Sequence, residues 1–123
     1  RRNELARNYD DLLSDLPLIR PTIREGNYSS FHLYVIRLQT RNAPQKHRMI
    51  FEGLQAEGIG VNLHYMPVHQ QPYYSKLGFE EGMFPESEAY GREAISLPMY
   101  PDLTKAKQER ICKVLKKLII SHF

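Results

Sequence analysis

The chain has 123 residues, which is enough for one domain with its own hydrophobic core but too few for two domains of ordinary size. Its formal net charge is +3, but the 17 basic and 14 acidic residues are largely interspersed, so the charge gives little support to nucleic-acid binding. The single cysteine excludes an intramolecular disulfide, and no apolar run reaches the roughly 20 residues that span a bilayer. We therefore expect a cytoplasmic protein without nucleic-acid or membrane partners.

Residues 1–16 predict an amphipathic helix that Pro17 ends. One apolar stripe recurs at helical spacing and consists of Leu5, Tyr9, Leu12 and Leu16. The chain opens on Arg1-Arg2-Asn3, without a methionine or a signal-peptide pattern. This opening is expected of a segment from the interior of a longer protein.

A turn over residues 26–30 precedes the strongest strand signal, which covers residues 31–39. Apolar residues fill most positions on both of its faces, which predicts a central strand covered on both sides. A helix follows, for which Asn42 is the predicted N-cap, Pro44 lies in the first turn and Gly58 ends the helix. Its buried face is predicted to contain His47, Ile50, Phe51 and Leu54.

The second half of the chain alternates predicted strands and helices. We expect a strand over residues 59–65, one helical turn over 72–77, a short helix over 85–93 and a brief strand over 95–97. Asp102 or Thr104 is predicted to cap a last helix with a buried side made of Ile111, Val114, Leu115, Leu118 and Ile119. This order predicts a two-layer α+β domain with a small sheet of about three strands packed with helices.

The segment from His64 to Tyr74 is the densest in polar aromatic groups, with two imidazoles, three phenols and two amides in eleven residues. Pro67 and Pro72 exclude a continuous helix there. Imidazoles and phenols form hydrogen bonds and also present flat apolar faces, which suits the recognition of sugars, bases or aromatic cofactors. The structural alternative is a packed connector whose imidazoles satisfy buried backbone groups.

Other chemistries have weaker support. His64 and His69 are potential metal ligands, but no third ligand or zinc motif accompanies them, so we expect no metal site. Cys112 falls in the apolar stripe of the last helix, where an inert thiol is expected. Ser96 lacks the glycine frame of a nucleophile elbow. The adjacent acids Glu80-Glu81 and the lysines of the last helix are expected on solvated surface.

Several motifs, taken in order, resemble one family closely. They are Arg2-x-x-x-Leu5-Ala6-x-x-Tyr9, Ser30-Phe31-His32-Leu33-Tyr34-Val35-Ile36-Arg37, Gly58-Ile59-Gly60-Val61, His64-Tyr65-x-Pro67-Val68-His69-x-Gln71-Pro72-Tyr73 and Ser96-Leu97-Pro98-x-Tyr100-Pro101. Nearly the whole chain thus resembles the C-terminal part of the DegT/DnrJ/StrS sugar aminotransferases, which are pyridoxal 5'-phosphate (PLP) enzymes of fold type I. The fourth motif is most similar to the transaminases that form 4-amino-4,6-dideoxy-N-acetyl-altrosamine on UDP.

The resemblance implies that residues 17–123 form the small domain, with a mainly antiparallel sheet, and that residues 1–16 end the helix joining it to a large domain. The Schiff-base lysine and the other PLP-binding motifs belong to that large domain, which is absent from this chain. We therefore expect no catalytic or cofactor-binding residue here and no transamination by the chain alone. The parent protein is expected to be a homodimer that transfers an amino group from glutamate to a UDP-linked 4-keto-6-deoxy sugar, in the biosynthesis of cell-surface or pseudaminic-acid-type sugars.

The resemblance also implies that His64 and Tyr65 lie at the mouth of the active site, against the sugar or phosphates of the substrate. His69 is the next candidate. Their expected roles are positioning and hydrogen bonding, because a lysine supplies the acid-base group in such enzymes. The competing hypothesis is a stand-alone module that binds sugars or nucleotides through the same segment without catalysis.

Overall fold

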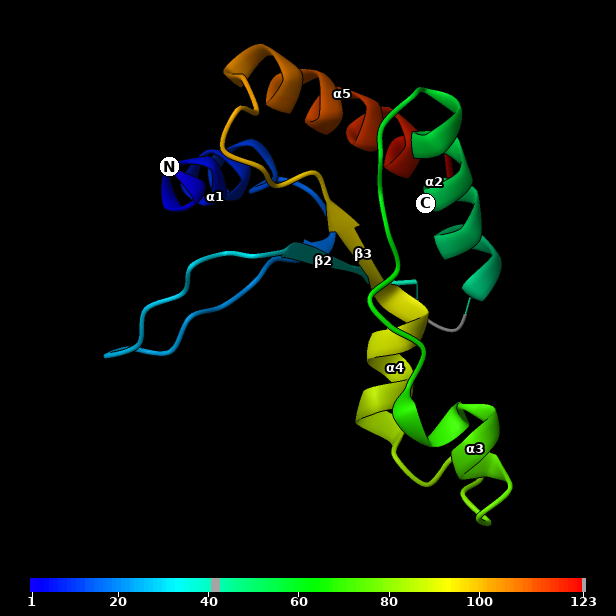
Figure 1. Ribbon diagram of the computed structural model, residues 1–123. Helices are drawn as coiled ribbons and strands as arrows, with labels where there is room; N and C mark the ends of the chain where they lie inside the picture. Colours follow the sequence, from blue (N-terminus) through cyan, green and yellow to red (C-terminus); the bar gives the residue numbers. More distant parts are fainter. Residues whose placement is uncertain (41–42, 123) are drawn as a thin grey trace.

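The computed structural model describes residues 1–40 and 43–122. Within these residues the chain forms the predicted α+β fold, an antiparallel sheet of three strands with helices packed on it (Figure 1). The strands lie in the order β1 (Leu18–Ile19), β2 (Tyr34–Leu38) and β3 (Ala94–Leu97). The strand with the strongest sequence signal, β2, is therefore central, as predicted.

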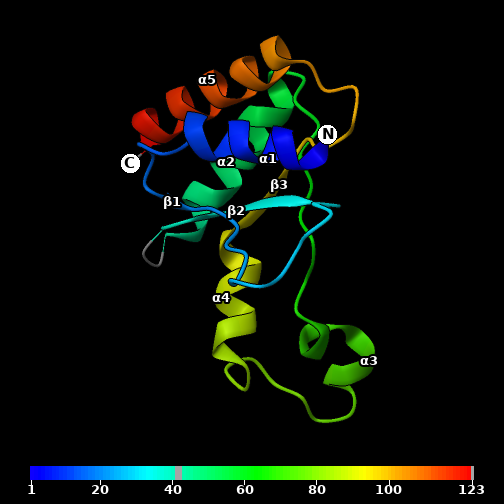
Figure 2. The same ribbon diagram turned by 90° about the vertical axis from the view of Figure 1, so that its left-hand side faces the viewer.

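The helices of the described residues occupy the two sides of this sheet. They are α1 (Arg2–Leu12), α2 (Pro44–Ala56), α3 (Pro72–Ser75), α4 (Pro85–Glu93) and α5 (Lys105–His122), with a short 3-10 turn, η1 (Val68–Gln70). In Figure 2, α1, α2 and α5 lie together above the sheet, whereas α4 and α3 extend below it. None of these helices is long and apolar enough to cross a membrane.

The core forms between one face of β2 and the helices above it. Tyr34, Ile36 and Leu38 point into this core and are fully buried. On the other face of the strand, Arg37 forms an ion pair of 2.8 Å with Glu93 at the end of α4. The second face is therefore covered at Arg37 by a charged pair rather than by the apolar packing that the sequence predicts.

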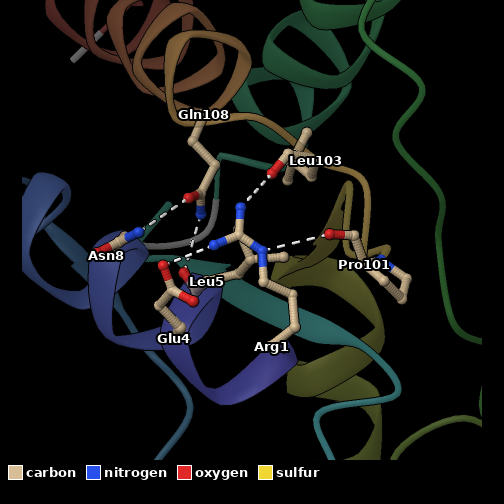
Figure 3. A network of polar contacts seen from close by, with 7 residues as sticks. All are labelled: Arg1, Glu4, Leu5, Asn8, Pro101, Leu103 and Gln108. Carbon is tan, nitrogen blue, oxygen red and sulfur yellow. Dashed lines mark hydrogen bonds and ion pairs between the residues drawn. The ribbon is translucent and has the colours of Figure 1, made fainter.

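Polar contacts tie the first helix to the last (Figure 3). The buried side chain of Gln108 on α5 donates from Nε2 to the carbonyl oxygen of Leu5 at 2.8 Å, and its Oε1 accepts from Asn8 Nδ2 at 3.4 Å. The Arg1 guanidinium donates to two carbonyl oxygens of the segment before α5, those of Pro101 and Leu103. The first helix is thus packed on this domain along its length.

The first helix is shorter than predicted, and its buried stripe is shifted. It ends at Leu12, which is 37% exposed, whereas Leu13 is fully buried. Burial follows a spacing of four residues from Leu5 through Tyr9 to Leu13, so the prediction for Leu12 was wrong. Leu16 packs against the edge of the core, as a partly buried side chain.

The predicted strand over residues 59–65 is reduced to a single bridge, in which Asn62 and Ser96 exchange two backbone hydrogen bonds. Beyond this bridge, the side chain of His64 rather than its backbone contacts Ser96, and the chain turns along α4. The backbone pairing thus ends at this bridge. The strand β1 was not predicted, because two residues after Pro17 are too few for an alternating pattern.

Helix α2 has the predicted buried side chains, with Phe51 partly buried. Asn42, the predicted cap of this helix, lies outside the described residues. Of the two predicted caps of α5, Thr104 is the one that forms, because its Oγ1 accepts a hydrogen bond of 3.3 Å from the backbone N–H of Lys107. The buried side of α5 contains Ile111, Leu115 and Ile119 as predicted, whereas Val114 and Leu118 are only partly buried.

Replacing Gln108 by leucine tests the tie between α1 and α5. The variant leaves the buried carbonyl oxygen of Leu5 and the partly buried amide of Asn8 without the Gln108 side chain, so its free energy of unfolding should fall by about 1–3 kcal/mol. Urea unfolding measures this change. The matched control is Gln55→Leu at an exposed position of α2, which should shift stability by no more than about 0.5 kcal/mol. Equal losses in both variants would contradict a special role of Gln108.

Candidate functional site

The segment from His64 to Tyr74 runs from the bridge with β3 along α4 and ends at α3 (Figure 1). It approaches α4 closely at Gly91, where an added Cβ would lie 2.9 Å from Pro67 Cδ. A side chain at this position would push the segment away from the helix. Glycine at position 91 therefore sets how near Tyr65 and Pro67 lie to α4.

Strand β3 orients the first residue of the segment. His64 Nδ1 and Ser96 Oγ share a hydrogen bond of 2.7 Å, and Ser96 is buried within the sheet. The pair therefore fixes the imidazole rather than presenting a serine nucleophile. The ring of Tyr65 packs edge-on against His64, with 4.7 Å between ring centroids, and 72% of the residue stays exposed. Ser96 thus holds the imidazole of His64 in place, and the ring of Tyr65 beside it is open to solvent.

His64 and Tyr65 line a surface hollow of about 390 Å³. Gln70 of η1, Glu81 of the loop before α4, and Glu88 and Arg92 of α4 line it as well. The structure thus brings two of the three predicted site residues together. Sequence reasoning missed Arg92 and assigned Glu81 to solvated surface. Only the spacing of Glu88 and Arg92, four residues apart on the predicted short helix, indicated that they share a face.

His69 lies elsewhere. It is 6% exposed, its ring packs 4.9 Å from that of Phe84, and it lines a separate apolar hollow with Tyr74 and Phe79. Its Nε2 donates to Glu88 Oε1 at 2.8 Å. The ring is buried as in the structural alternative, but its partner is a side-chain carboxylate rather than a backbone group. Substrate binding by His69 stays a prediction.

The carboxylate of Glu88 gathers several donors at one buried point. Its Oε1 accepts from His69 and from the backbone N–H groups of Gly82 and Phe84, at 2.8 and 3.4 Å for the two backbone bonds. Arg92 Nη1 lies 3.8 Å from the other oxygen. Desolvation raises the pKa of Glu88, but the hydrogen bonds from His69 and the two backbone groups outweigh it, and the net pKa lies below its ordinary value.

Cys112 is buried on α5, and desolvation raises the pKa of its thiol to about 12. The thiol stays protonated at neutral pH, which agrees with the inert cysteine that the sequence predicts. In residues 1–40 and 43–122, no group of three or more histidine, cysteine, aspartate or glutamate side chains is arranged to hold a metal ion.

Comparison with known proteins identifies the family. The model of the DegT/DnrJ/EryC1/StrS aminotransferase family matches residues 1–116. The chain belongs to this family. It is 30% identical to the spore coat polysaccharide biosynthesis protein SpsC of Bacillus subtilis over 122 residues, and 35% identical to the EryC1 protein of Saccharopolyspora erythraea over 118 residues. These matches cover 97% and 94% of this chain but only 31% of each relative, so the chain spans about a third of their length.

Solved structures of family members have the same fold. Spr1654 from Streptococcus pneumoniae, in its PMP form, superimposes with a TM-score of 0.92 at 24% identity, over 99% of this chain and 31% of that one. Helicobacter pylori PseC, an aminotransferase involved in the biosynthesis of pseudoaminic acid, gives a TM-score of 0.86 at 28% identity, over 98% and 32% of the two chains. The predicted fold class, an α+β domain with a small antiparallel sheet packed with helices as in PLP-dependent aminotransferases, is thereby confirmed.

This part of such an enzyme does not itself fit PLP. A lysine that forms a Schiff base needs a desolvated site that lowers its pKa. None of the lysines of the chain is buried, and all except the half-buried Lys46 are exposed. The described residues therefore contain no lysine suited to forming a Schiff base with PLP.

Replacing Glu88 by glutamine tests the carboxylate as the anchor of the segment. The folded-state pKa of Glu88 lies below its ordinary value of 4.5, so the ionised group stabilises the fold above pH 4.5 and this contribution is lost as pH falls below that value. Glu88→Gln should lower stability at pH 7 and flatten the loss of stability between about pH 5 and pH 3. Urea unfolding at a series of pH values measures both effects.

The matched control is Glu86→Gln, at an exposed position of the same helix, which should leave the wild-type pH dependence in place. Hydrogen exchange at the amides of Gly82 and Phe84 provides a local readout, because both donate to Glu88. The anchor role is contradicted if Glu88→Gln unfolds with the same acid dependence as the wild type and leaves these amides protected.

Proposed function

We propose that this chain is the C-terminal, substrate-facing part of a PLP-dependent aminotransferase that transfers an amino group from glutamate to a UDP-linked 4-keto-6-deoxy sugar. Family membership over residues 1–116 supports the reaction class. The observation that carries the substrate-facing role is the hollow in which Ser96 holds His64 while Tyr65 remains open. Such a surface supplies hydrogen bonds and an aromatic face to a sugar nucleotide.

The proposed product is UDP-4-amino-4,6-dideoxy-N-acetyl-altrosamine, an intermediate on the way to pseudaminic-acid-type sugars. The sequence of the segment from His64 to Tyr73 supports this choice, together with the 28% identity and the TM-score of 0.86 to PseC. We propose the cytoplasm as the location of the protein and a homodimer as its assembly, following the expectation from the sequence.

In this proposal, residues 17–123 form the small domain and residues 1–16 end the helix that enters it from a large domain. The packing of α1 on α5 through Gln108 supports a stiff connection at this point. The relatives are about three times as long as this chain, which leaves room for a PLP-binding domain with its own lysine. The PLP bound by that domain would act as the electron sink for the amino transfer.

The residues of this chain bind and orient the substrate. His64 is fixed by β3 and presents its remaining ring nitrogen for a hydrogen bond, while Tyr65 offers its ring and hydroxyl. His69 is proposed to act on the substrate only through the position of the segment, because it is buried against Glu88. None of the three needs to move a proton in this role.

The first test uses the family-length protein that contains this chain. His64→Ala and Tyr65→Phe should lower kcat/KM for a UDP-4-keto-6-deoxy sugar by about tenfold, the loss expected for one or two hydrogen bonds, and leave PLP binding intact. The assay follows the transfer of labelled nitrogen from glutamate. Tyr73→Phe, which is 68% exposed in the same segment, is the control and should keep wild-type kinetics. Unchanged sugar kinetics in both variants would refute the assignment.

The second test uses the 123-residue chain itself and separates the enzyme from a stand-alone module. Mixed with PLP, the chain should develop no Schiff-base absorbance, because none of its lysines lies in the desolvated site that such a bond needs. A stable adduct at one lysine, trapped with borohydride and located by mass spectrometry, would contradict the proposal. Pyridoxamine-dependent amination of the sugar by the chain alone would contradict it as well.

A further inference from the structure

The hollow beside His64 and Tyr65 has an unusual charge balance for a site that faces a sugar nucleotide. Its acidic and basic lining residues, apart from His64, are one arginine, Arg92, and two glutamates, Glu81 and Glu88. Sites for a diphosphate are typically built from arginines, lysines and backbone N–H groups, since each phosphate carries negative charge. The acids here would oppose a diphosphate placed in the hollow.

The same lining suits a neutral ring with hydroxyl or amide substituents. Such substituents need acceptors as well as donors, and the hollow offers both, with Glu81 as an acceptor, Arg92 as a donor and Gln70 as either. The exposed ring of Tyr65 adds a flat apolar face. This lining therefore suits a sugar ring better than the phosphates that link the sugar to the nucleotide.

Arg92 remains available for such a ligand. Its side chain is 52% exposed, and within residues 1–40 and 43–122 its ion pair is with Glu88, at 3.8 Å, which is beyond hydrogen-bond distance. The Oε1 atom of Glu88 already accepts from three other donors. Among the described residues, no short hydrogen bond therefore holds the Arg92 guanidinium, and its donors can turn toward a ligand in the hollow.

We infer that this hollow binds the hexose ring of the nucleotide sugar rather than its diphosphate, and that Glu81 and Arg92 are specificity-determining residues for the ring substituents. The inference rests on the proposed function and deepens it. It assigns the diphosphate to a surface outside this hollow. Glu81 from the loop before α4 and Arg92 from α4 line this hollow together with His64 and Tyr65.

The test compares two constants in the family-length enzyme, KM for the UDP-4-keto-6-deoxy sugar and the inhibition constant of UDP. UDP contains the diphosphate but no hexose, so it reports contacts outside the hollow. Arg92→Gln and Glu81→Gln should each raise KM for the sugar nucleotide by about tenfold, as for the loss of one hydrogen bond to a charged group. Both should change the inhibition constant of UDP by less than about twofold.

Matched controls exist for both positions. Arg110 resembles Arg92 in exposure, at 55%, and in its 3.8 Å ion pair with a glutamate, but it lies on α5 away from the hollow. Glu80 is exposed and adjacent to Glu81 without lining the hollow. Arg110→Gln and Glu80→Gln should keep wild-type values of both constants. Arg92→Lys keeps the charge but not the fork of donors, and should recover only part of the loss.

The outcomes separate this inference from the proposed function. A parallel rise of KM and of the inhibition constant of UDP in Arg92→Gln would place the diphosphate in the hollow and overturn the inference. Wild-type constants in both Arg92→Gln and Glu81→Gln would overturn it as well. Absence of amino transfer by the wild-type enzyme would instead refute the proposed function itself.

Discussion

The buried carboxylate of Glu88 is the constraint on which the candidate site depends. One oxygen of this group accepts from an imidazole in η1 and from two backbone N–H groups in the loop before α4, so three stretches of chain meet at a single atom. Outside α4, these stretches contain few regular hydrogen bonds and leave many apolar side chains exposed. The carboxylate on α4 is the one described atom at which all three stretches meet, so its loss would release contacts in each of them. The pKa of Glu88, lowered by its partners, keeps that anion in place at neutral pH.

The sequence predicted the helices and the central strand because each has a strong local pattern. The residues of α4 matched its prediction at both ends, since Pro85 fits the first turn of a helix and the strand β3 follows directly. The errors lie where tertiary contacts override such patterns. Leu12 and Leu13 are equally apolar, yet only Leu13 is buried in the core. Likewise, the predicted strand after Gly58 pairs at one position only, the bridge between Asn62 and Ser96.

The candidate site was predictable in part. His64 and Tyr65 stand out in the sequence by their density of polar aromatic groups, and both line the hollow. His69 has the same appearance in the sequence, yet its surroundings differ, because burial and a carboxylate partner are properties of the fold. Arg92 and Glu81 belong to no motif and reach the hollow through the packing of α4 against the segment. A composition-based search therefore finds the aromatic residues of such a site and misses the charged ones.

Helix α4 ends at Glu93 and β3 begins at Ala94, with no loop between them. Arg92 and Ser96 thus reach the neighbourhood of His64 from two elements joined by a rigid junction. An inserted or deleted residue at this junction would rotate the helix by about 100° relative to the strand and move Arg92 off the hollow. A change of chain length at this junction would therefore disturb the hollow, whereas replacements at positions 81 and 92 would alter the chemistry of its lining and leave the path of the backbone unchanged.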